Sequence, residues 1–456
     1  MVIQFFKLLN ESVIFYCLFP SILLIGLFLT WKLRFLQIRG LKKSLSFLLN
    51  IPSKNVQKNS YEGTVSRLAS IASVLAGNFG TGTISGVAVS LVMGGPGSLV
   101  WMWVASFFCA IVQYAGSFLA VKHRRALSFG GFVGGPMVYL QKQGKTGLSF
   151  IFCIFTLASA FTTGNILQVN AIALAFPSFP FSKIILGLSL ILPVSLVIVK
   201  GAKKIANFSV KVVPFISIFY LIACCFVLFI NYEAIWPSCK LVFSSAFKIR
   251  STFGGICGFS LAQVISTGIS RAIMATDGGT GFVSILQSNS KSSNPVIDGI
   301  VTLLPPFIVM IVCSLTGLTL LASSAYKENL FSTSMILYAF TSSLGNKIGF
   351  ILIFSSILLF AYTTILAWFA CAESIIFFFT EKKFFNLLLK FFFLLTLPLG
   401  AVINSNFIWL LSDFAYIGMI LINLIVIIGG IKEVMRSAYL DLSGLTESYS
   451  PSVSKK

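Results

Sequence analysis

Glycine clusters interrupt two apolar segments of this chain and bring backbone polar groups to places where they can bind a ligand. The first cluster, LAGNFGTGTISGVA over residues 75–88, has four glycines within ten residues. Each glycine costs a helix interior about 1 kcal/mol relative to alanine, so the segment is predicted to unwind. Free backbone groups at membrane depth are tolerated where they line a cavity. The pattern therefore predicts a binding site at Gly80, Thr81 and Gly82, although small residues for close helix packing are an alternative.

The second interruption is STGISRAIMATDGGTG, residues 266–281. If it lies as far into its apolar segment as the first one does, the second break falls near Thr267 and Gly268. Matching positions of the two breaks indicate an internal repeat.

The composition places these segments in a membrane. Of 456 residues, 57% are apolar and only 10% are charged, and the mean hydropathy is +0.96. Soluble domains are about a quarter charged, so a water-facing protein is excluded. Hydropathy predicts eleven crossings of an all-α polytopic membrane protein: 12–31, 66–92, 98–121, 148–176, 182–199, 212–230, 253–275, 299–322, 348–379, 384–403 and 407–431.

The net charge of +21 follows the membrane topology. Most of the Lys and Arg residues fall in loops on the side where the second crossing begins. This asymmetry predicts an N-terminus outside the cell and a cytoplasmic C-terminus, in the cell (inner) membrane. Basic loops against an anionic leaflet account for the charge without nucleic acid. Residues 12–31 are interpreted as a retained helix rather than a signal peptide.

Counting from the breaks divides the chain into two halves of five helices. The predicted units are an N-terminal helix and basic loop (1–65), a first repeat (66–235), an inverted second repeat (251–431) and a cytoplasmic tail (432–456). Inverted repeats with discontinuous first helices are typical of secondary transporters, which bind their substrate near the midplane. No convergent nucleophile, base or metal set indicates an enzyme. A closed midplane site also disfavours a channel.

Several motifs resemble the sodium:alanine (alanine/glycine:cation) symporter family. GTGTISGVAVSLVMGGPGSLVWMW at 80–103 is close to the family signature. Further matches follow in family order: GGPMVYL at 134–140, GNILQVNAIA at 164–173, YTTILAW at 362–368 and LLSDF at 410–414. The resemblance implies a LeuT-like 5+5 inverted repeat with one extra N-terminal helix. It implies sodium-coupled uptake of a small neutral amino acid, with no cofactor and no obligate protein partner.

The chain departs from the family pattern at three places. Thr83 replaces the Asn of the signature, Thr276 and Asp277 begin the segment that reads NEAG in the family, and Tyr416 replaces a late Asn. These departures leave substrate choice and ion coupling more open than the fold.

An amino-acid carboxylate needs donors without a full buried charge, and the amides of a broken helix supply them. Thr81, Gly82 and Thr83 are predicted in this role, with Gly268 from the second repeat. The amides of Asn165 and Gln168 lie three residues apart on one helical face, so both could reach one ligand, although each could instead bond to a neighbouring helix. The resemblance favours Gln168. From sequence alone Trp368 could equally pack against lipid, and the resemblance favours it as a cap that limits the substrate to a small side chain.

Sodium prefers oxygen ligands, and the fold analogy assigns it the carbonyls of Ala76 and Phe79. The hydroxyls of Thr363 and Thr364 are predicted to complete this site, with a bond to the carbonyl four residues back in their own helix as the alternative. Proton coupling remains an alternative, because Asp277, Glu373 and Asp413 lie within or beside predicted crossings. None of the three is expected at the midplane: Glu373 is predicted near the interface, Asp413 on the outer side, and Asp277 well beyond the second break, towards the cytoplasm. Sodium is therefore preferred. A differently selective carrier of the same fold is also possible.

Overall fold

The computed structural model describes residues 10, 12–49, 65–176, 180–247, 250–253, 256–291 and 294–447. These residues form a helical bundle with two small hairpins, so the all-α polytopic prediction is confirmed in outline. Eight helical stretches of the described chain are long and apolar enough to cross a membrane: Ile14–Lys32, Ser98–His123, Thr146–Ala175, Ala202–Ile230, Pro295–Ala322, Asn346–Phe379, Lys383–Val402 and Ser405–Arg436.

The elements up to residue 245 follow one another in this order: η1 (Ile14–Leu18), α2 (Phe19–Lys32), α3 (Leu36–Leu49), α4 (Arg67–Asn78), α5 (Ser85–Gly94), α6 (Ser98–His123), β1 (Arg125–Ala126), β2 (Phe132–Val133), α7 (Pro136–Lys142), α8 (Thr146–Phe161), η2 (Thr162–Ile166), α9 (Leu167–Ala175), α10 (Pro180–Ser189), α11 (Ile191–Ile198), α12 (Ala202–Ile230) and α13 (Tyr232–Ser245).

The remaining elements are β3 (Arg250–Phe253), β4 (Ile256–Ser260), α14 (Leu261–Thr276), α15 (Phe282–Gln287), α16 (Pro295–Val301), α17 (Leu304–Ala322), η3 (Ala325–Glu328), α18 (Thr333–Leu344), α19 (Asn346–Phe379), α20 (Lys383–Leu395), α21 (Leu397–Val402) and α22 (Ser405–Glu447).

The other predicted crossings fall on short or interrupted helices. Residues 66–92 become α4 and α5, and residues 182–199 become α10 and α11. The seventh crossing was predicted to start at residue 253, and this start is wrong. Strands β3 and β4 form an antiparallel hairpin there, with Arg250 opposite Ser260. Helix α14 begins only at Leu261, after the Ser260 hydroxyl accepts a hydrogen bond from the Gln263 amide at 3.2 Å.

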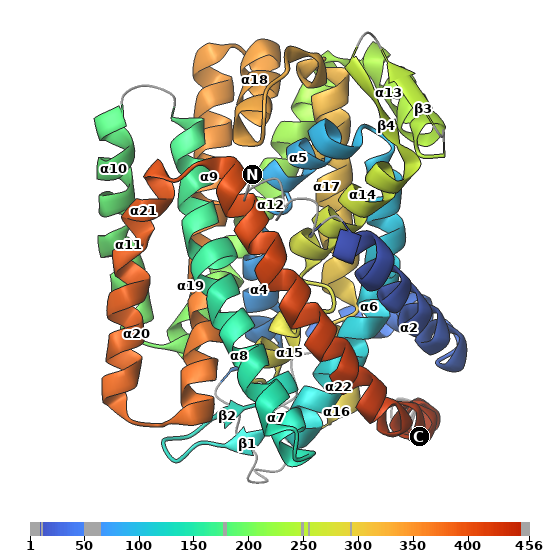
Figure 1. Cartoon of the computed structure of the whole chain (residues 1–456), viewed down its shortest axis with the longest axis vertical. Coiled ribbons are helices and arrows are strands. Elements are labelled where there is room, and N and C mark those ends of the chain that lie inside the picture. Colours follow the sequence, from blue (N-terminus) through green and yellow to red (C-terminus); the bar gives the residue numbers. More distant parts are fainter. Residues whose placement is uncertain are drawn as a thin grey trace, which may run out of the picture.

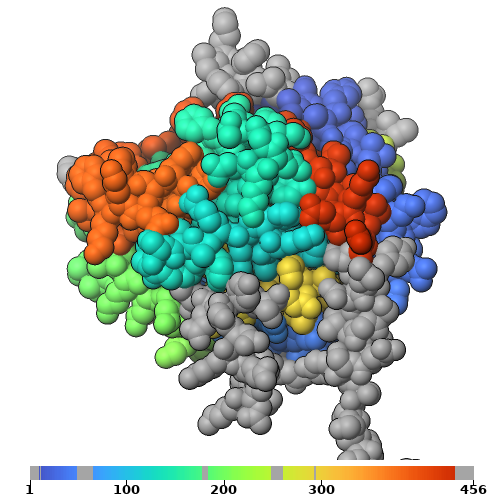
Figure 2. Space-filling model, turned by 90° about the horizontal axis from the view of Figure 1, so that it is seen from below, coloured from blue at the N-terminus to red at the C-terminus, as the bar shows by residue number. Residues whose placement is uncertain are grey.

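The broken helices lie at the centre of the bundle (Figure 1). Helix α4 packs against α12 and α19, whereas α14 packs along α5 and α6. Helix α2 lies outside this group, against α6. Seen from the end that carries α7, the segment around β1, β2 and α7 spans the face between the α19–α20 pair and α22 (Figure 2). We call this the α7 end and the opposite one the α18 end.

Helix α12 shows how the bundle separates its two environments. Tyr220 and Val227 are fully buried, and they face the core with their neighbours at helical spacing. The large apolar side chains on the other side are exposed: Phe215, Ile218, Ile222, Phe226 and Phe229. A helix that packs against the protein core on one side and against lipid on the other is expected to be apolar on both sides.

Two predicted units extend beyond the described residues. Residues 50–64 of the predicted basic loop and residues 448–456 of the predicted tail lie outside them. Within the described part, α3 forms in the predicted loop, and α22 continues past residue 431 to Glu447.

Candidate functional site

The first predicted break is confirmed. Helix α4 ends at Asn78 and α5 starts at Ser85, with turns between them. Local bonds satisfy the backbone that the helix leaves open. The Thr83 hydroxyl donates to the Gly80 carbonyl at 2.9 Å, and the Gly86 amide donates to the Thr81 carbonyl at 2.6 Å. Thr83 is therefore engaged with its own segment.

Gly80 lies where two neighbouring helices come closest to the break. A Cβ atom at this position would lie 2.6 Å from Thr364 Oγ1 and 2.9 Å from Gln168 Oε1. No side chain fits there without a shift of these groups. The glycine therefore brings α19 and α9 against the unwound backbone.

Gln168 binds the break directly. Its Oε1 accepts a hydrogen bond from the Thr81 amide at 3.1 Å, and its Nε2 donates to the Thr81 hydroxyl at 3.0 Å. Nε2 also donates to the Thr163 carbonyl at 2.9 Å. The predicted residues Thr81 and Gln168 are thus brought together, and both are buried.

The oxygens predicted to bind an ion are partly brought together. The Thr364 hydroxyl donates to the Ala76 carbonyl at 2.8 Å. It can also donate to Phe360 O within its own helix, at 2.9 Å. Thr363 is fully buried, but its hydroxyl bonds only that same carbonyl, at 3.0 Å. Phe79 caps α4, and its ring packs against Phe360 with a centroid separation of 5.7 Å.

Asn165 does not join Gln168, so the prediction that their amides converge is wrong. Its Nδ2 donates to the Phe393 carbonyl at 2.7 Å and to the Thr396 hydroxyl at 3.1 Å. The cause is η2, a π-helical turn over Thr162–Ile166. A wider turn changes the rotation between residues three apart. Asn165 consequently faces α20, whereas Gln168 faces the break.

The second break lies later than predicted. Thr267 and Gly268 belong to a continuous α14, and the helix ends at Thr276. Asp277, Gly279 and Gly281 then adopt positive φ angles of 50°, 79° and 88°. The prediction of a break at Gly268 is wrong. A Cβ atom on Gly268 would lie 2.5 Å from the Ser98 carbonyl, so this glycine allows α14 to pack closely on α6.

The two breaks lie against each other. Asn78 at the end of α4 donates its Nδ2 to the Thr276 carbonyl at the end of α14, over 3.2 Å. A Cβ atom on Gly77 would lie 2.4 Å from the Phe282 ring, and one on Gly82 would lie 2.6 Å from the Met274 carbonyl. The first break therefore needs glycine at these two positions, where it lies against the second break. We call this contact between the two breaks the crossing.

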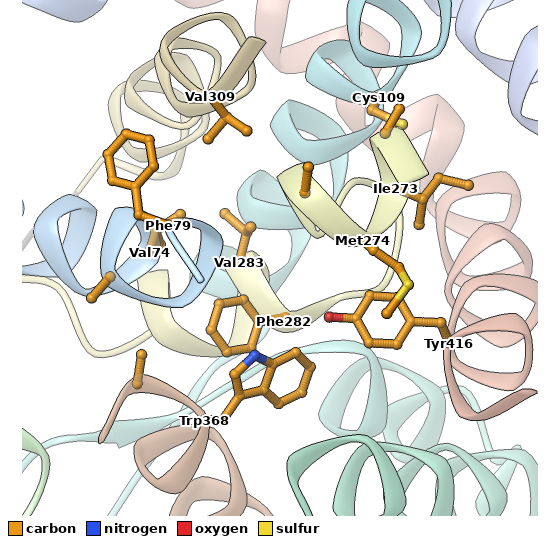
Figure 3. Close-up of a cluster of buried hydrophobic side chains, with 14 of the residues drawn as sticks. Val74, Phe79, Cys109, Ile273, Met274, Phe282, Val283, Val309, Trp368 and Tyr416 are labelled. Atoms are coloured by element: carbon orange, nitrogen blue, oxygen red, sulfur yellow. The ribbon is translucent and has the colours of Figure 1, made fainter. Parts of the chain in front are cut away.

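Aromatic rings cover this crossing on one side. Trp368 is fully buried and stacks on Phe282, with ring centroids 4.3 Å apart. The centroid of the Tyr416 ring lies 5.9 Å from that of the Trp368 ring. Figure 3 shows the stacked pair, with the Tyr416 hydroxyl directed toward the segment that joins α14 to α15. Trp368 therefore belongs to the core rather than to the lipid-facing surface.

Sequence reasoning misplaced one charged group near the crossing and missed another. Asp277 was expected well beyond the break, but it is the first residue of the break itself and is 1% exposed. Arg271 was not considered, yet it is 3% exposed and forms an ion pair with Asp413 on α22, with Nη2 2.7 Å from Oδ1. The TDGGTG pattern at 276–281 could have marked the break, since glycine ends helices through positive φ.

Three pockets show how far solvent-sized space extends towards the crossing. A pocket lined by Gly80, Thr81 and Phe360 is too narrow for a water molecule. A pocket of about 360 Å³ lies beside the ends of α9 and α21, lined in part by Asn170 and Asn404. Another of about 350 Å³ lies at the α7 end, where Glu373 and Lys390 are among its residues. The central groups are therefore closed off in this arrangement.

Comparisons with known proteins agree on one family. The model of the sodium:alanine symporter family matches residues 1–441. A Methanococcus maripaludis protein named sodium/alanine symporter AgcS is 31% identical over 410 residues, which cover 88% of each chain. An uncharacterized transporter of Haemophilus influenzae is 32% identical over 409 residues, 89% of this chain and 88% of the relative.

More distant similarities are also to transporters. A Bacillus subtilis protein named probable sodium/glutamine symporter GlnT is 28% identical over 407 residues, 88% of this chain and 83% of the relative. Among solved structures, a manganese transporter of Eremococcus coleocola matches with a TM-score of 0.42 and 14% identity. That match covers 85% of this chain and 98% of the other.

Proposed function

The chain belongs to the sodium:alanine symporter family, and from that premise we propose that it couples sodium entry to uptake of a small neutral amino acid of the alanine/glycine class. It is a multi-pass membrane transport protein, and its relatives are transporters rather than enzymes. We further propose eleven crossings in a LeuT-like 5+5 inverted repeat. In this topology the N-terminus lies outside the cell membrane and the C-terminus in the cytoplasm.

The contact of Thr364 with Ala76 is the observation that carries the ion assignment. Two oxygens from different helices meet at 2.8 Å at the end of a broken helix. A sodium ion coordinated by both oxygens would replace the hydrogen bond between them. The Phe79 carbonyl and the Thr363 hydroxyl would be its further ligands. Oxygen ligands and unwound carbonyls are what sodium sites in such transporters use.

The substrate is proposed to bind beside the ion. The amides at Thr81, Gly82 and Thr83 would receive its carboxylate, and the Gln168 carboxamide would exchange its bond with Thr81 for one with the substrate. Gly268 and Asn165 face other helices in the closed arrangement, so they are weaker candidates. Trp368 and Phe282 occupy the space that a long side chain would need.

Sodium entry can supply the energy for uptake. One charge that crosses 100 mV contributes about 2.3 kcal/mol. This corresponds to roughly 50-fold accumulation of substrate, since about 1.4 kcal/mol is a factor of ten. Pockets at both ends with a closed centre support alternating access, in which the two repeats rock around the crossing. Lipid is the surrounding solvent, and neither a cofactor nor a protein partner is required.

A proton-coupled or differently selective carrier is the second candidate. The position of Asp277 inside the second break favours it, because a buried carboxyl at such a place is a usual proton carrier.

Uptake of labelled alanine, glycine and serine into proteoliposomes tests the proposal. Sodium and pH gradients are imposed separately, with a membrane potential held constant. The proposal predicts accumulation that requires the sodium gradient. Accumulation with a pH gradient alone and without sodium would overturn the sodium assignment.

A further inference from the structure

Asp277 is a buried acid with one oxygen left without a donor. The Tyr416 hydroxyl donates to Oδ1 at 2.5 Å, whereas Oδ2 has no hydrogen-bond partner. Ion pairs in the described part of the chain use other acids, namely Glu433 and Asp413. The Asp277 carboxylate would therefore carry a negative charge that no basic side chain compensates.

Side-chain donors already fill the backbone carbonyls around Asp277. The Thr276 carbonyl accepts from Gln113 Nε2 at 2.6 Å as well as from Asn78. The Asp277 carbonyl accepts from the Thr280 hydroxyl at 2.8 Å, and the Gly279 carbonyl accepts from Asn423 Nδ2 at 2.8 Å. These carbonyls are the groups that a metal ion would use in an unwound segment. The Thr276 and Gly279 carbonyls accept from carboxamide N–H groups, whose nitrogen, unlike the oxygen of a threonine hydroxyl, cannot itself bind a cation. We therefore assign no metal ion to this segment.

A single proton satisfies Oδ2 of Asp277. An ionised carboxylate out of water costs several kcal/mol when nothing compensates its charge. A proton on Oδ2 removes that charge. We propose that Asp277 binds a proton on Oδ2 in the closed arrangement and releases it when the crossing opens to water. On release the O–H bond breaks, the electron pair stays on Oδ2, and a water molecule accepts the proton.

The groups packed around Asp277 leave it as the site of this proton. Helix α22 contributes Tyr416 and, one turn earlier, Asp413, which is paired with Arg271. Helix α19 contributes Cys371, and α6 contributes Cys109, which lies against Gly278, together with neutral Gln113. Helix α4 contributes the neutral amide of Asn78. The Tyr416 hydrogen bond stabilises the ionised carboxylate, so Tyr416 acts as a positioning residue for the proton.

The proton site rests on the proposed function, because it gains a role only if the crossing opens during transport. The second break would then sense protons, while the first break holds sodium and the substrate. Asn78, which ends α4 and contacts Thr276, joins the two segments directly. Loss of a proton at Asp277 would therefore disfavour the closed arrangement in which both breaks are packed together.

Sodium-driven alanine uptake measured at a series of pH values tests the proton site. The pH is set equal inside and outside the proteoliposomes, so that no pH gradient drives transport. Above its midpoint, wild-type uptake is expected to fall about tenfold per pH unit, as for one titrating group. Asp277→Asn, which resembles the protonated form, is expected to vary less than about twofold over the same range. Tyr416→Phe is expected to move the midpoint to higher pH.

An acid in the segment between α19 and α20, Glu381, supplies the matched control. Hydrogen bonds from Ser128 to Glu381 hold the pKa of this carboxyl below its ordinary value. Glu381→Gln should therefore follow the wild-type profile. Equal pH profiles for wild type and Asp277→Asn would overturn the proposal, as would a midpoint that Tyr416→Phe leaves unchanged.

Infrared difference spectroscopy on the purified protein gives a readout that needs no transport. A protonated-carboxyl C=O band that disappears as the pH rises in wild type, and is missing from Asp277→Asn, supports the proposal even if that variant is inactive. A wild-type spectrum without the band, or the same band in Asp277→Asn, overturns it. Sodium-driven uptake with no such band would leave the proposed function standing alone. A pH-dependent band without sodium-driven uptake would refute the proposed function instead.

Discussion

Thr364 donates its hydroxyl to the carbonyl of Ala76 over 2.8 Å, and this contact joins α19 to the last turn of α4. Ala76 is 288 residues away along the chain. A helix end leaves its last carbonyls without intrahelical partners, so the contact satisfies a group that the break would otherwise leave open. The same two oxygens are those we assign to the coupling ion.

Close approach at Gly80 gives the first prediction. In Gly80→Ala the new Cβ would push against Thr364 Oγ1 and Gln168 Oε1, at 2.6 and 2.9 Å. These two groups would have to move, and a misplacement of about 1 Å at a functional site reduces a rate about 100-fold. The rate of alanine uptake is expected to fall by this order. The control is Gly86→Ala, whose Cβ would have no neighbour closer than 3.5 Å. Equal uptake by the two variants would contradict the assignment of Gly80 to the site.

The sequence predicted the first break because its cause is local. Four glycines in a short apolar run disfavour a helix whatever its surroundings. In the structure the helix is interrupted between Asn78 and Ser85. The large apolar crossings were predictable for the same reason, since length and hydropathy are properties of the segment itself. Contacts such as that of Gly80 with Gln168 depend on how distant helices pack, and no local pattern specifies them.

The second break was misplaced because its position was copied from the first. Helix α14 has 16 residues before its break, whereas α4 has 12. The β3–β4 hairpin also occupies residues that hydropathy assigned to the membrane. Two related helices can differ in the number of residues before their breaks. The glycines that follow Asp277 therefore predict the position of the second break better than its expected spacing does.

Gln168 and Asn165 give the second prediction, because the π-helical turn separates their roles. Gln168→Ala removes the carboxamide that contacts Thr81 in the closed arrangement and is proposed to bind the substrate instead. The variant is expected to raise the KM for alanine about tenfold, as loss of a hydrogen bond worth about 1.4 kcal/mol would. Asn165→Ala removes bonds to α20 and the residue after it. It should lower the melting temperature and leave KM within about twofold. The reverse pattern would show that the two assignments are exchanged.

The ion pair between Arg271 and Asp413 gives the third prediction. It joins α14 to α22, and the guanidinium also lies over the Trp409 ring at 4.8 Å. Removal of one partner of a buried pair costs about 3–5 kcal/mol, because the other charge is left uncompensated. Arg271→Ala and Asp413→Ala should each lower thermal stability strongly. The double variant should be more stable than the sum of the two losses implies, and strict additivity would show that the pair contributes no coupling.

Trp368 gives the fourth prediction, which concerns substrate size. Its ring stacks on Phe282 at the crossing and fills space next to the first break. Trp368→Phe should therefore allow a longer neutral amino acid to compete with labelled alanine about tenfold more effectively than it does in the wild type. Competition by valine and leucine measures this directly. Unchanged selectivity in a folded variant would place the size limit elsewhere.

The most direct test of the account is the sodium dependence of alanine uptake in Thr364 and Thr363 variants. Thr364→Ala should raise the sodium concentration for half-maximal uptake about tenfold or more, because one oxygen ligand is lost. Thr364→Ser keeps the oxygen and should stay within about twofold of wild type. Thr363→Ala is expected to have the smaller effect of the two alanine variants, since its hydroxyl bonds only Phe360 of its own helix. A folded Thr364→Ala protein with wild-type sodium dependence would contradict the placement of the ion at the end of α4.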